Sequence, residues 1–358
     1  MLTVGIVFGG CSVEHEISIL SAIQVMAAID ENKYKVIPIY LTKNNIFTIG
    51  KNLHKLETFR RKPKLKKVIW DHNYIKGFLY KKKLDCVICC VHGRGVEGGE
   101  LAGFLELNNI AYTSIGVMGA SIAQDKIICK DVLAHNGFDV IPYFGFSKTM
   151  WKENRQEVIT RVSHLQYPLI VKAAKLGSSI GIYHAFNDEE LLIGLVKTMQ
   201  YDTRILVEEM LEDFSEYNCS IIGKKTISQI EEVISSEHFL SFKDKYTKTQ
   251  AKRIIPAQID AELEAKIYTY TKEIANILDN KGVIRIDYLF DNKKQKLYVN
   301  EVNSIPGSLG YYLYESKGVY FDDLMDLLIN DAIKDHHFKT KLISSFSSNV
   351  LNMEGIKK

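Results

Sequence analysis

Segments typical of strands and helices alternate along the first ~120 residues, and this alternation restricts the fold more than any other feature of the chain. Apolar runs of strand length cover residues 4–8, 35–41 and 84–91, and helical patterns cover 17–29 and 100–109. Strands that alternate with helices predict a parallel sheet with crossover helices. The N-terminal part is therefore expected to form an α/β domain with a Rossmann-like arrangement.

The chain has 358 residues, which is enough for two or three domains. After the first block, one continuous helix is expected from 121 to 137, and Asn187 or Asp188 is expected to cap a later helix. The predicted units are an N-terminal domain at 1–124, a central subdomain at 125–211 and a C-terminal subdomain at 212–358 with a mobile loop at 241–253.

The composition narrows the class of protein. Hydrophobic residues make up 46% and charged residues 25%, and the net charge is only +3 with both signs interspersed, so nucleic acid is not expected as a partner. No segment approaches the roughly 20 apolar residues needed to span a bilayer, and no signal peptide is recognisable. Neither a membrane partner nor a disulfide scaffold is expected, and the six cysteines favour the cytoplasm. Cys86, Cys89 and Cys90 fall in an apolar run and are interpreted as buried hydrophobes.

Two strand-like segments near the C-terminus, GVIRIDYLF and KLYVNEVN, are separated by a polar turn and predict a hairpin. Residues two apart in a strand share a face, so Arg285 lies beside Asp287, and Glu301 beside Asn303. Hard oxygen ligands of this kind hold Mg²⁺, and the arginine suits a transferring phosphoryl group. A solvated face with cross-strand salt bridges is an equally good interpretation of the hairpin alone.

Two glycine-rich loops follow strands. Lys172 precedes LGSSIG, a loop whose amides and hydroxyls suit phosphates, although it lacks the Gly-Lys-Ser/Thr of a Walker loop and a plain hairpin turn stays open. Gly9-Gly10 follows the first strand, where open α/β sheets place ligands, but it is not a dinucleotide fingerprint. Glu14, just beyond, would by itself be interpreted as an acid at a helix N-terminus.

These pieces occur in one order, and the chain resembles the D-alanine–D-alanine ligases, including the D-alanine–D-serine ligases of vancomycin resistance. The resemblance covers nearly the whole chain and rests on FGGCSVEHEISI, HGRGVEGGELAGFLELNNIAYTSIGV, QDKIICK, LGSSIGI, VEEML, DKYTKT, RIDYLF and NEVNSIPGS. It implies an ATP-grasp fold and a cytoplasmic ATP-dependent ligase that phosphorylates one D-alanine and joins it to a second amino acid. It also implies a homodimer.

The resemblance further implies a role for individual residues. Arg285 and the Gly307 amide would form the oxyanion site, Glu14 would bind the first ammonium with His92 nearby, and Ser178 and Tyr246 would link with Glu14. ATP contacts are assigned to Lys126, Lys172, Glu208, Glu209, Leu211, Glu216 and Lys245, and two Mg²⁺ ions, or Mn²⁺, to Asp287, Glu301 and Asn303. The loop with Lys245 is expected to act as a lid.

The chain departs from the family pattern at several points. Alanine follows Lys172 where proline is usual, Glu97 is followed by Gly-Gly instead of Asp-Gly, and Ala102 replaces a common glutamine. Tyr312 stands where relatives have a serine near the acceptor carboxylate, and Ser308 is a further candidate for that contact. The ATP and metal residues match the family, whereas the acceptor pocket does not.

The predicted activity is therefore ATP-dependent ligation of D-alanine to a second D-amino acid, with D-alanine favoured, for peptidoglycan synthesis. A ligase for another amino-acid pair, such as D-alanine with D-serine or a pair forming a small peptide metabolite, is the first alternative. A nucleotide-binding relative without catalysis is the second. A Rossmann oxidoreductase is disfavoured because the glycine fingerprint is missing.

Overall fold

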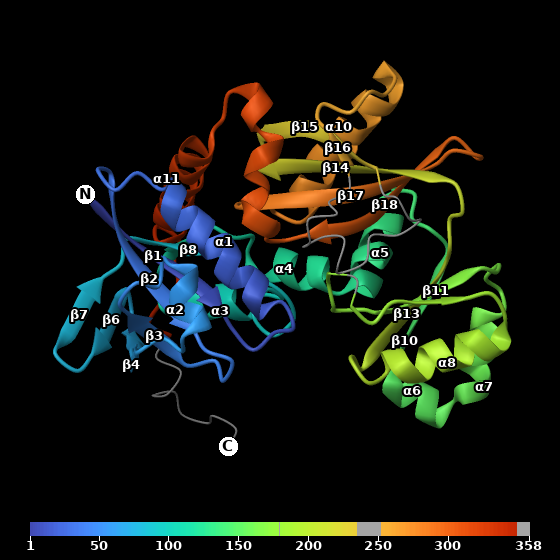
Figure 1. Ribbon diagram of the computed structural model, residues 1–358, viewed down its shortest axis with the longest axis horizontal. Helices are drawn as coiled ribbons and strands as arrows, with labels where there is room; N and C mark the ends of the chain where they lie inside the picture. Colours follow the sequence, from blue (N-terminus) through green and yellow to red (C-terminus); the bar gives the residue numbers. More distant parts are fainter. Residues whose placement is uncertain (179, 235–251, 349–358) are drawn as a thin grey trace.

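The computed structural model describes residues 1–178, 180–234 and 252–348. Three main sheets follow one another along the chain, with helices packed against them (Figure 1). Within the described residues, every helix is too short or too polar to span a lipid bilayer.

The first sheet has six strands in the order β4-β3-β2-β1-β8-β9. Strand β1 pairs in parallel with β2 and β8, and β8 with β9, as predicted, while β3 and β4 add an antiparallel edge. The strands are β1 (Leu2–Gly9), β2 (Tyr34–Leu41), β3 (Phe47–Gly50), β4 (Leu65–Lys67), β8 (Cys86–Cys89) and β9 (Ala111–Tyr112). The flanking helices are α1 (His15–Ala28), α2 (Leu56–Arg60) and α3 (Glu100–Leu107).

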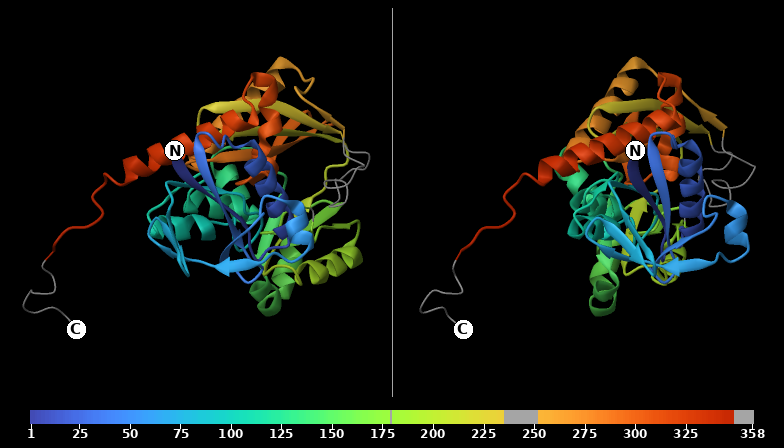
Figure 2. Two further views of the ribbon diagram at one scale, coloured as in Figure 1. Left: turned by 60° about the vertical axis from the view of Figure 1, so that its left-hand side comes forward. Right: turned by 90° about the vertical axis from the view of Figure 1, so that its left-hand side faces the viewer.

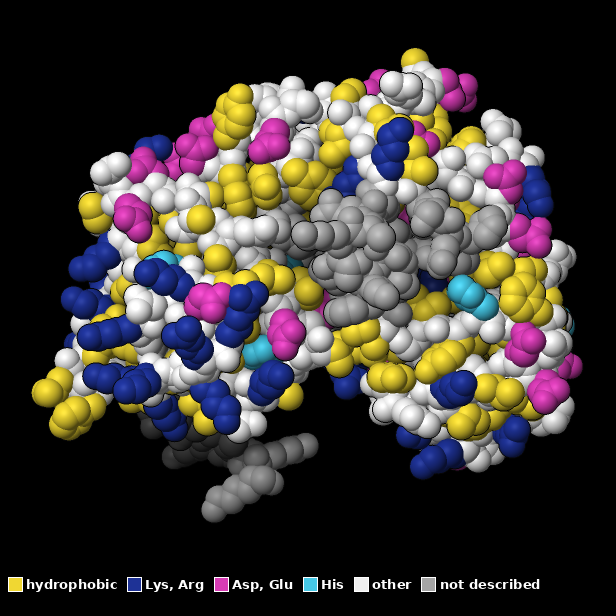
Figure 3. All heavy atoms as spheres, viewed as in Figure 1, with side chains coloured by type: hydrophobic (Ala, Val, Ile, Leu, Met, Phe, Trp, Pro, Cys, Tyr) yellow, Lys and Arg dark blue, Asp and Glu magenta, His cyan; other side chains and the backbone are white. Residues whose placement is uncertain are grey.

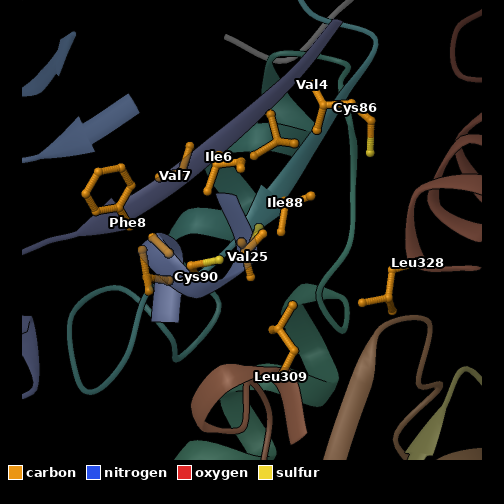
Figure 4. Packing of buried hydrophobic residues seen from close by; sticks show 14 of the residues in the cluster. Val4, Ile6, Val7, Phe8, Val25, Cys86, Ile88, Cys90, Leu309 and Leu328 are labelled. Carbon is orange, nitrogen blue, oxygen red and sulfur yellow. The ribbon is translucent and has the colours of Figure 1, made fainter. Parts of the chain in front are cut away.

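The core of this first sheet includes residues from the opposite end of the chain. Leu309 and Leu328 belong to the same buried cluster as Val25 and Ile88 (Figure 4). Leu328 lies on α11 (Phe321–Lys339), which crosses the first sheet before residues 340–348 lead away from the body (Figure 2). The short 3₁₀ segments η1 (Gly307–Leu313) and η2 (Glu315–Lys317) connect this helix to the last hairpin. The first and last parts of the sequence therefore share one hydrophobic core.

The predicted cysteine burial is confirmed. Cys86 and Cys90 have no exposed surface and Cys89 almost none, and all three belong to the first core. Burial raises the pKa of the Cys89 thiol to about 12. These thiols therefore behave as small hydrophobes in the sheet.

The second sheet has four antiparallel strands in the order β10-β13-β11-β12. Its strands are β10 (Tyr143–Ser147), β11 (Leu169–Ala173), β12 (Tyr183–Ala185) and β13 (Arg204–Glu209), and its helices are α6 (Lys148–Glu153), α7 (Arg155–Val162) and α8 (Asp188–Thr198). The predicted cap of α8 is confirmed, because Asn187 accepts a hydrogen bond from the Glu190 amide at 3.0 Å. The helices lie together on one side of this sheet (Figure 1), which leaves its other face open toward the third sheet.

The third sheet has five antiparallel strands in the order β16-β15-β14-β17-β18. Its strands are β14 (Phe214–Ile222), β15 (Thr226–Ile234), β16 (Lys252–Ile254), β17 (Val283–Asp291) and β18 (Lys296–Asn303). Helices α10 (Ala261–Ile277), α4 (Val117–Gln124) and α5 (Lys126–His135) pack around it.

The single helix expected over 121–137 is wrong, because the chain breaks between α4 and α5 at Asp125. The Asp125 side chain accepts hydrogen bonds from the amides of Ile127 and Ile128 at 3.2 and 3.3 Å and so caps a new helix. This break places Lys126 in the first turn of α5, where it faces the site described below.

A small three-stranded sheet was not predicted. It consists of β5 (Ile69–Asp71), β6 (Tyr74–Gly77) and β7 (Tyr80–Lys83), which pair as consecutive antiparallel strands. Its sequence is rich in lysine, which is depleted in strands, so the local pattern resembles a solvated loop.

Candidate active site

The hairpin of β17 and β18 has the register that the sequence predicts. Arg285 lies opposite Asn303, and Asp287 lies opposite Glu301, before a bulge that follows Asp287. One arginine, two carboxylates and one amide therefore meet on a single face. A cavity of about 540 Å³ opens beside this face and is called the substrate cavity below.

Arg285 forms a bidentate pair with Asp287. Its Nε donates to Oδ1 at 2.6 Å and its Nη2 donates to Oδ2 at 2.7 Å, while Asn303 Nδ2 donates to the same Oδ2 at 3.0 Å. Burial acts to lower the pKa of the Arg285 guanidinium, but attraction to Asp287 outweighs it and raises that pKa well above its ordinary value. The cavity wall therefore carries a fixed positive charge that suits developing anionic charge.

Glu301 is held by Lys126. Lys126 Nζ lies 3.3 Å from Glu301 Oε2 and donates to the Leu176 carbonyl at 2.8 Å. Burial acts to lower the pKa of Lys126, but the carboxylates of Glu301 and Glu14 outweigh it and raise that pKa. Lys126 thus stays charged between the hairpin and the glycine-rich loop.

The donor set Asp287, Glu301 and Asn303 fits Mg²⁺, which takes hard oxygen ligands from one or two carboxylates together with substrate phosphates. Among the described residues, no three His, Cys, Asp or Glu side chains cluster closely enough to hold a metal by themselves. An ion at this face would therefore need the Asn303 oxygen and ligands from a bound substrate in addition to the two carboxylates.

A second cavity of about 310 Å³ lies between the second and third sheets and is called the nucleotide cavity below. Its lining includes the predicted ATP residues Lys126, Lys172, Glu208, Glu209, Leu211 and Glu216. Lys126, Gly177, Ser178, Glu216 and Glu301 line both cavities. The two cavities therefore adjoin at the hairpin.

A buried triad of charges forms one wall of the nucleotide cavity. Glu208 is 1% exposed and forms ion pairs with Lys172 and with Lys130, the latter at 3.1 Å. Burial acts to raise the pKa of Glu208, but the two ammonium groups outweigh it and lower that pKa to about 2. The Glu208 carboxylate therefore fixes the lysines in place.

The neighbouring Glu209 behaves differently. Its carboxylate accepts a hydrogen bond from the Gln166 amide at 3.0 Å in an exposed position. Leu211 and Glu216 line the nucleotide cavity further along, and Glu216 also borders the substrate cavity.

Glu14 occupies the N-cap position of α1 but makes no hydrogen bond to the helix amides through its side chain. Its Oε1 instead accepts a hydrogen bond from the Ser178 hydroxyl, as the family resemblance implies. A Cβ on Gly177 would lie 3.1 Å from both Glu14 oxygens, so glycine allows the loop to approach this closely. The contact brings the first domain against the glycine-rich loop.

His92 lies close to the loop that carries Gly307 and Ser308. The Ser21 hydroxyl contacts His92 Nε2 at 2.9 Å and accepts a hydrogen bond from the Ser308 amide at 3.1 Å. Burial lowers the pKa of the His92 ring to about 4, so the ring is neutral at pH 7. The Ser308 hydroxyl also donates to Gln24, which fixes the loop to α1. Gly307 itself faces open space in the cavity.

Tyr312 and a buried carboxylate form the far wall of the substrate cavity. The Tyr312 hydroxyl donates to Glu231 Oε2 at 3.2 Å, and the Asn218 amide donates to the same oxygen at 3.0 Å. Arg253 lies 5.0 Å from the centre of the Tyr312 ring and 3.4 Å from Glu231 Oε1. Burial, aided by Glu231, raises the pKa of Tyr312 to about 12, so the phenol keeps its proton.

Lys245 and Tyr246 lie outside the described residues, as does most of the predicted loop at 241–253. The last two residues of that range, Lys252 and Arg253, belong to β16.

The sequence alone did not identify Lys130, Glu97, Glu231 or Arg253. Lys130 follows Lys126 by four positions on one helix, a spacing that places both side chains on the same face. Glu231 is followed by Glu232 in β15, and because side chains alternate faces along a strand, only one of these two carboxylates can face the cavity. No local sequence pattern identifies Arg253 as part of the site.

Glu97 connects two loops that are far apart in sequence. Its carboxylate accepts hydrogen bonds from the Gly93 amide at 2.7 Å, the Ser304 hydroxyl at 2.9 Å and the Ile305 amide at 3.1 Å. Burial raises the pKa of Glu97 to about 7, and the nearby charge of Glu14 adds to this effect. Glu97 thus ties the loop after β8 to the loop that carries Gly307.

Sequence and structure comparisons agree with this geometry. Family models described as D-ala D-ala ligase N-terminus and D-ala D-ala ligase C-terminus match residues 3–115 and 132–330. The chain is 35% identical to the D-alanine--D-alanine ligase of Thermosipho melanesiensis and 36% identical to that of Thermosipho africanus, with 99% of each chain covered.

Solved structures are similar along the same length. The D-alanine-D-alanine ligase from Coxiella burnetii has a TM-score of 0.82 at 25% identity and covers 96% of this chain and 97% of its own. The VanG D-Ala:D-Ser ligase from Enterococcus faecalis has a TM-score of 0.81 at 26% identity and covers 92% of this chain and 99% of its own. Fold and site together define an α/β protein of the ATP-grasp type. The chain belongs to the D-alanine–D-alanine ligase family.

Proposed function

We propose that this protein is an ATP-dependent ligase that activates D-alanine and joins it to a second D-amino acid, with D-alanine as the favoured acceptor, for peptidoglycan synthesis. The observation that carries the proposal is the contact between the two cavities at Lys126, Ser178 and Glu301. A nucleotide in one cavity and an amino acid in the other would place a phosphoryl group beside a carboxylate. Relatives named D-alanine--D-alanine ligase, which match this chain over 99% of its length, support this assignment.

The reaction has two bond exchanges. A carboxylate oxygen of the first D-alanine attacks the γ-phosphorus of ATP, and the bond to the ADP oxygen breaks. The amine of the acceptor then attacks the acyl carbon, and the bond to the phosphate oxygen breaks as the amine loses a proton. The products are a dipeptide, ADP and inorganic phosphate.

The residues on the hairpin serve the charge that moves in these steps. Arg285 and the Gly307 amide would stabilise the oxyanion at the acyl carbon. Glu14 would bind the ammonium of the first D-alanine, oriented by its contact with Ser178. Asp287, Glu301 and Asn303 would hold Mg²⁺, with Mn²⁺ as a substitute, and the ions supply charge neutralisation at the phosphates when bound.

The remaining ATP contacts surround the nucleotide cavity. Lys126 and Lys172 would meet phosphate oxygens or the base, and Glu216 the ribose. Glu208, Glu209 and Leu211 would border the adenine, with the Glu208 carboxylate acting mainly through the two lysines that it holds. Lys245 and Tyr246 would come from the loop at 241–253 and close over the site, which protects an acylphosphate from water.

The acceptor wall favours a second possibility, a ligase for D-alanine and another small amino acid such as D-serine. Tyr312 is bound to the buried carboxylate of Glu231, and Arg253 stands beside it. A wall of this charge pattern suits an acceptor that carries a hydrogen-bonding side chain. The acceptor carboxylate would contact Tyr312 or Ser308.

We also propose a location, partners and an oligomeric state for the enzyme. It acts in the cytoplasm on free ATP and D-alanine, without nucleic acid, and forms a homodimer. Its working units are the N-terminal domain at 1–124 and the two ATP-grasp subdomains at 125–211 and 212–358, whose junction holds the nucleotide.

The decisive experiment measures phosphate release from ATP by the full chain with Mg²⁺ and single or paired D- and L-amino acids, together with product masses. We expect release with D-alanine, a D-alanyl-D-alanine product, no reaction with L-alanine alone, and loss of activity with EDTA. Phosphate release that needs a pair without D-alanine would assign a different ligase, and no release with any pair would support a non-catalytic relative.

Two further assays address the loop and the nucleophile. ATP with a phosphinate analogue of the acylphosphate should protect the chain from protease near Lys245, and an unchanged cleavage pattern would exclude a lid. The family resemblance implies that Lys245-Tyr246 in this loop belongs to a ligase that uses an amine nucleophile. We therefore expect a dipeptide instead of an ester when D-lactate competes with D-alanine at neutral pH.

A further inference from the structure

The segment at 59–83 is unusually basic for this chain. It contains ten lysines and arginines and one acidic residue, Asp71, so its formal charge is +9 while the whole chain carries +3. The other residues therefore sum to −6, and the positive charge is concentrated in a short part of the sequence. The segment includes β4 and the small sheet of β5, β6 and β7.

The positive charges are exposed and largely without acidic partners. Among the described residues, only Asp71 and Glu57 form ion pairs with this segment, with Lys76 and Arg60 respectively. The exposed cations are Arg60, Arg61, Lys62, Lys64, Lys66, Lys67, Lys81, Lys82 and Lys83. Figure 3 shows Lys and Arg side chains gathered over the region that Figure 1 labels β4, β6 and β7, with hydrophobic side chains at its outer edge. This set is called the basic face below.

Few contacts within the fold use the charges of the basic face. Lys81 lies over the Tyr74 ring and Arg60 pairs with Glu57. Lys76 and Lys81 are directly paired across β6 and β7, and like charges opposite one another destabilise a sheet. A requirement outside the folded chain therefore explains the charge better than internal stability does.

The tip of the β6–β7 hairpin is apolar and fully exposed. Phe78 and Leu79 form its two-residue turn between the paired Gly77 and Tyr80, and they are 93% and 94% exposed. Two-residue hairpin turns favour Asn-Gly or similar pairs, and Leu79 has a φ of 56°, which is costly for a leucine. Neither residue is explained by turn geometry or by packing.

We propose that the basic face binds the surface of a lipid bilayer that contains anionic lipids, with Phe78 and Leu79 inserted among the acyl chains. Each lysine or arginine close to an anionic membrane increases binding by about five-fold, and exposed apolar residues at the tip add the buried area that charge alone lacks. The sequence predicts no membrane partner because it lacks a spanning segment, but binding at the surface requires none.

Nucleic acid fits the same charge less well. Proteins that bind single strands combine a basic groove with aromatic side chains on which bases stack. Here the apolar pair projects from a convex hairpin, and one of its two members is aliphatic. The lipid surface is therefore the better partner.

The basic face also lies where a membrane would not block the site. Strands β6 and β7 are at the opposite end of the molecule from β11 and β13, which border the nucleotide cavity (Figure 1). The enzyme can therefore bind its substrates while it is held at the bilayer.

The proposal is tested by co-sedimentation of the full chain with vesicles of phosphatidylcholine alone and of phosphatidylcholine with phosphatidylglycerol. We expect at least about ten-fold tighter binding to the anionic vesicles, falling steeply as salt rises. A Phe78→Trp variant should show blue-shifted emission with these vesicles as its side chain leaves water. Equal binding to both vesicle types, or no binding to either in dilute buffer, would overturn the proposal.

Two variants separate the apolar tip from the charge. Phe78→Asn with Leu79→Gly gives the hairpin a favoured turn, so the chain should fold normally while binding falls by about ten-fold or more. Lys81→Gln with Lys83→Gln should reduce binding by about 25-fold, two steps of the five-fold effect. A matched control, Lys293→Gln with Lys334→Gln, removes two exposed charges elsewhere and should bind as the wild type does. Ligase activity without vesicles should be the same in all these variants.

Two other results would contradict the lipid assignment. Undiminished vesicle binding by the Asn-Gly tip variant, together with displacement by a short single-stranded RNA, would indicate a polyanion site of the nucleic-acid kind. A decrease in molecular mass caused by the same variant in sedimentation experiments would mean that the tip packs against a second copy of the chain.

Discussion

The two sides of the substrate cavity differ in how their charges are held. On the hairpin side, Arg285 and Lys126 pair with Asp287 and Glu301 across short distances, so each charge has a fixed partner. On the acceptor side, Glu231 is 1% exposed, and its Oε1 has no hydrogen bond among the described residues. Its counter-charge is Arg253, which lies 3.4 Å away and has a side chain that is 48% exposed.

This difference separates two parts of the site. The reaction itself determines the arrangement of the hairpin side, whereas the acceptor side can vary with the amino acid that it binds. Phosphoryl and acyl transfer develop the same charges for any amino acid, so the hairpin needs one arrangement. Recognition of the acceptor depends on its size and polar groups, and a wall whose cation is half-exposed can accommodate different ones.

The largest effect is expected on the hairpin. Asp287→Asn or Glu301→Gln removes a carboxylate from the proposed Mg²⁺ site and should lower turnover by roughly 1,000-fold or more while the chain stays folded. Steady-state phosphate release at saturating Mg²⁺ measures the change. Asp291→Asn on the same strand is the matched control, because asparagine can still accept from the Lys293 and Lys294 amides. Near-normal turnover by either site variant would remove the metal assignment.

The second prediction concerns the buried triad at the nucleotide cavity. Glu208→Gln leaves the ammonium groups of Lys130 and Lys172 buried without a counter-charge, so the free energy of unfolding should fall by about 3–5 kcal/mol. Urea unfolding measures it. The adjacent Glu209→Gln is the control, since the Glu209 carboxylate accepts a hydrogen bond from the Gln166 amide that glutamine can also accept, and its cost should stay below about 1 kcal/mol. Equal costs for the two variants would mean that Lys130 and Lys172 lose their charge instead.

The hairpin and the buried triad differ in how far the sequence alone predicts them. The hairpin was predictable because its strands are adjacent and their side chains alternate faces, so Arg285 and Asp287 share a face. The triad was not, because its members come from α5, β11 and β13, and a buried carboxylate is stable only once all three meet. The local sequence pattern is enough to predict the hairpin arrangement, whereas the triad can be recognised only in the tertiary fold.

Dependence on the tertiary fold also explains why other features of the site were not predicted from the sequence. The break at Asp125 depends on how α5 packs beside β18, although the residue itself is a good cap. Glu97 joins loops more than 200 positions apart, and no local pattern indicates that pairing. Family resemblance supplied Glu14 and Ser178 for the same reason, because 164 positions separate the two residues that meet.

The third prediction concerns His92 and the pH dependence of stability. The folded ring has a pKa of about 4 against an ordinary 6.5, so between these values the unfolded chain binds a proton that the folded chain does not. Stability should therefore fall as pH drops through this window, by roughly 3 kcal/mol, and should not depend on this group above about pH 6.5.

Urea unfolding at about pH 7 and about pH 4.5 measures this slope. His92→Asn should reduce the difference between the two conditions, because no ring remains to be protonated. The exposed His54→Asn is the control and should leave the difference unchanged. If His92→Asn and His54→Asn both keep the wild-type difference, protonation of His92 is not what lowers the free energy of unfolding in acid.

The smallest effect is expected at Tyr312, on the acceptor side. Its phenolic proton goes to Glu231 in the structure, so an acceptor carboxylate would have to take that proton in place of Glu231. If it does, Tyr312→Phe removes a charge-assisted hydrogen bond worth about 1.5–3 kcal/mol, and KM for the acceptor should rise roughly ten-fold or more while KM for ATP barely changes. Steady-state kinetics with the acceptor varied at saturating ATP measures the two constants separately.

Two comparison variants decide what a change at Tyr312 means. Glu231→Gln keeps an acceptor for the phenol but removes the negative charge, so it should strengthen binding of the acceptor carboxylate if Glu231 competes for the proton. Ser308→Ala removes a hydroxyl that already donates to Gln24, so little change is expected. An acceptor effect confined to Ser308→Ala would place the contact on that residue. An equal loss in Tyr312→Phe and Glu231→Gln would mean instead that the pair only positions the wall, with Arg253 left as the group that meets the acceptor carboxylate.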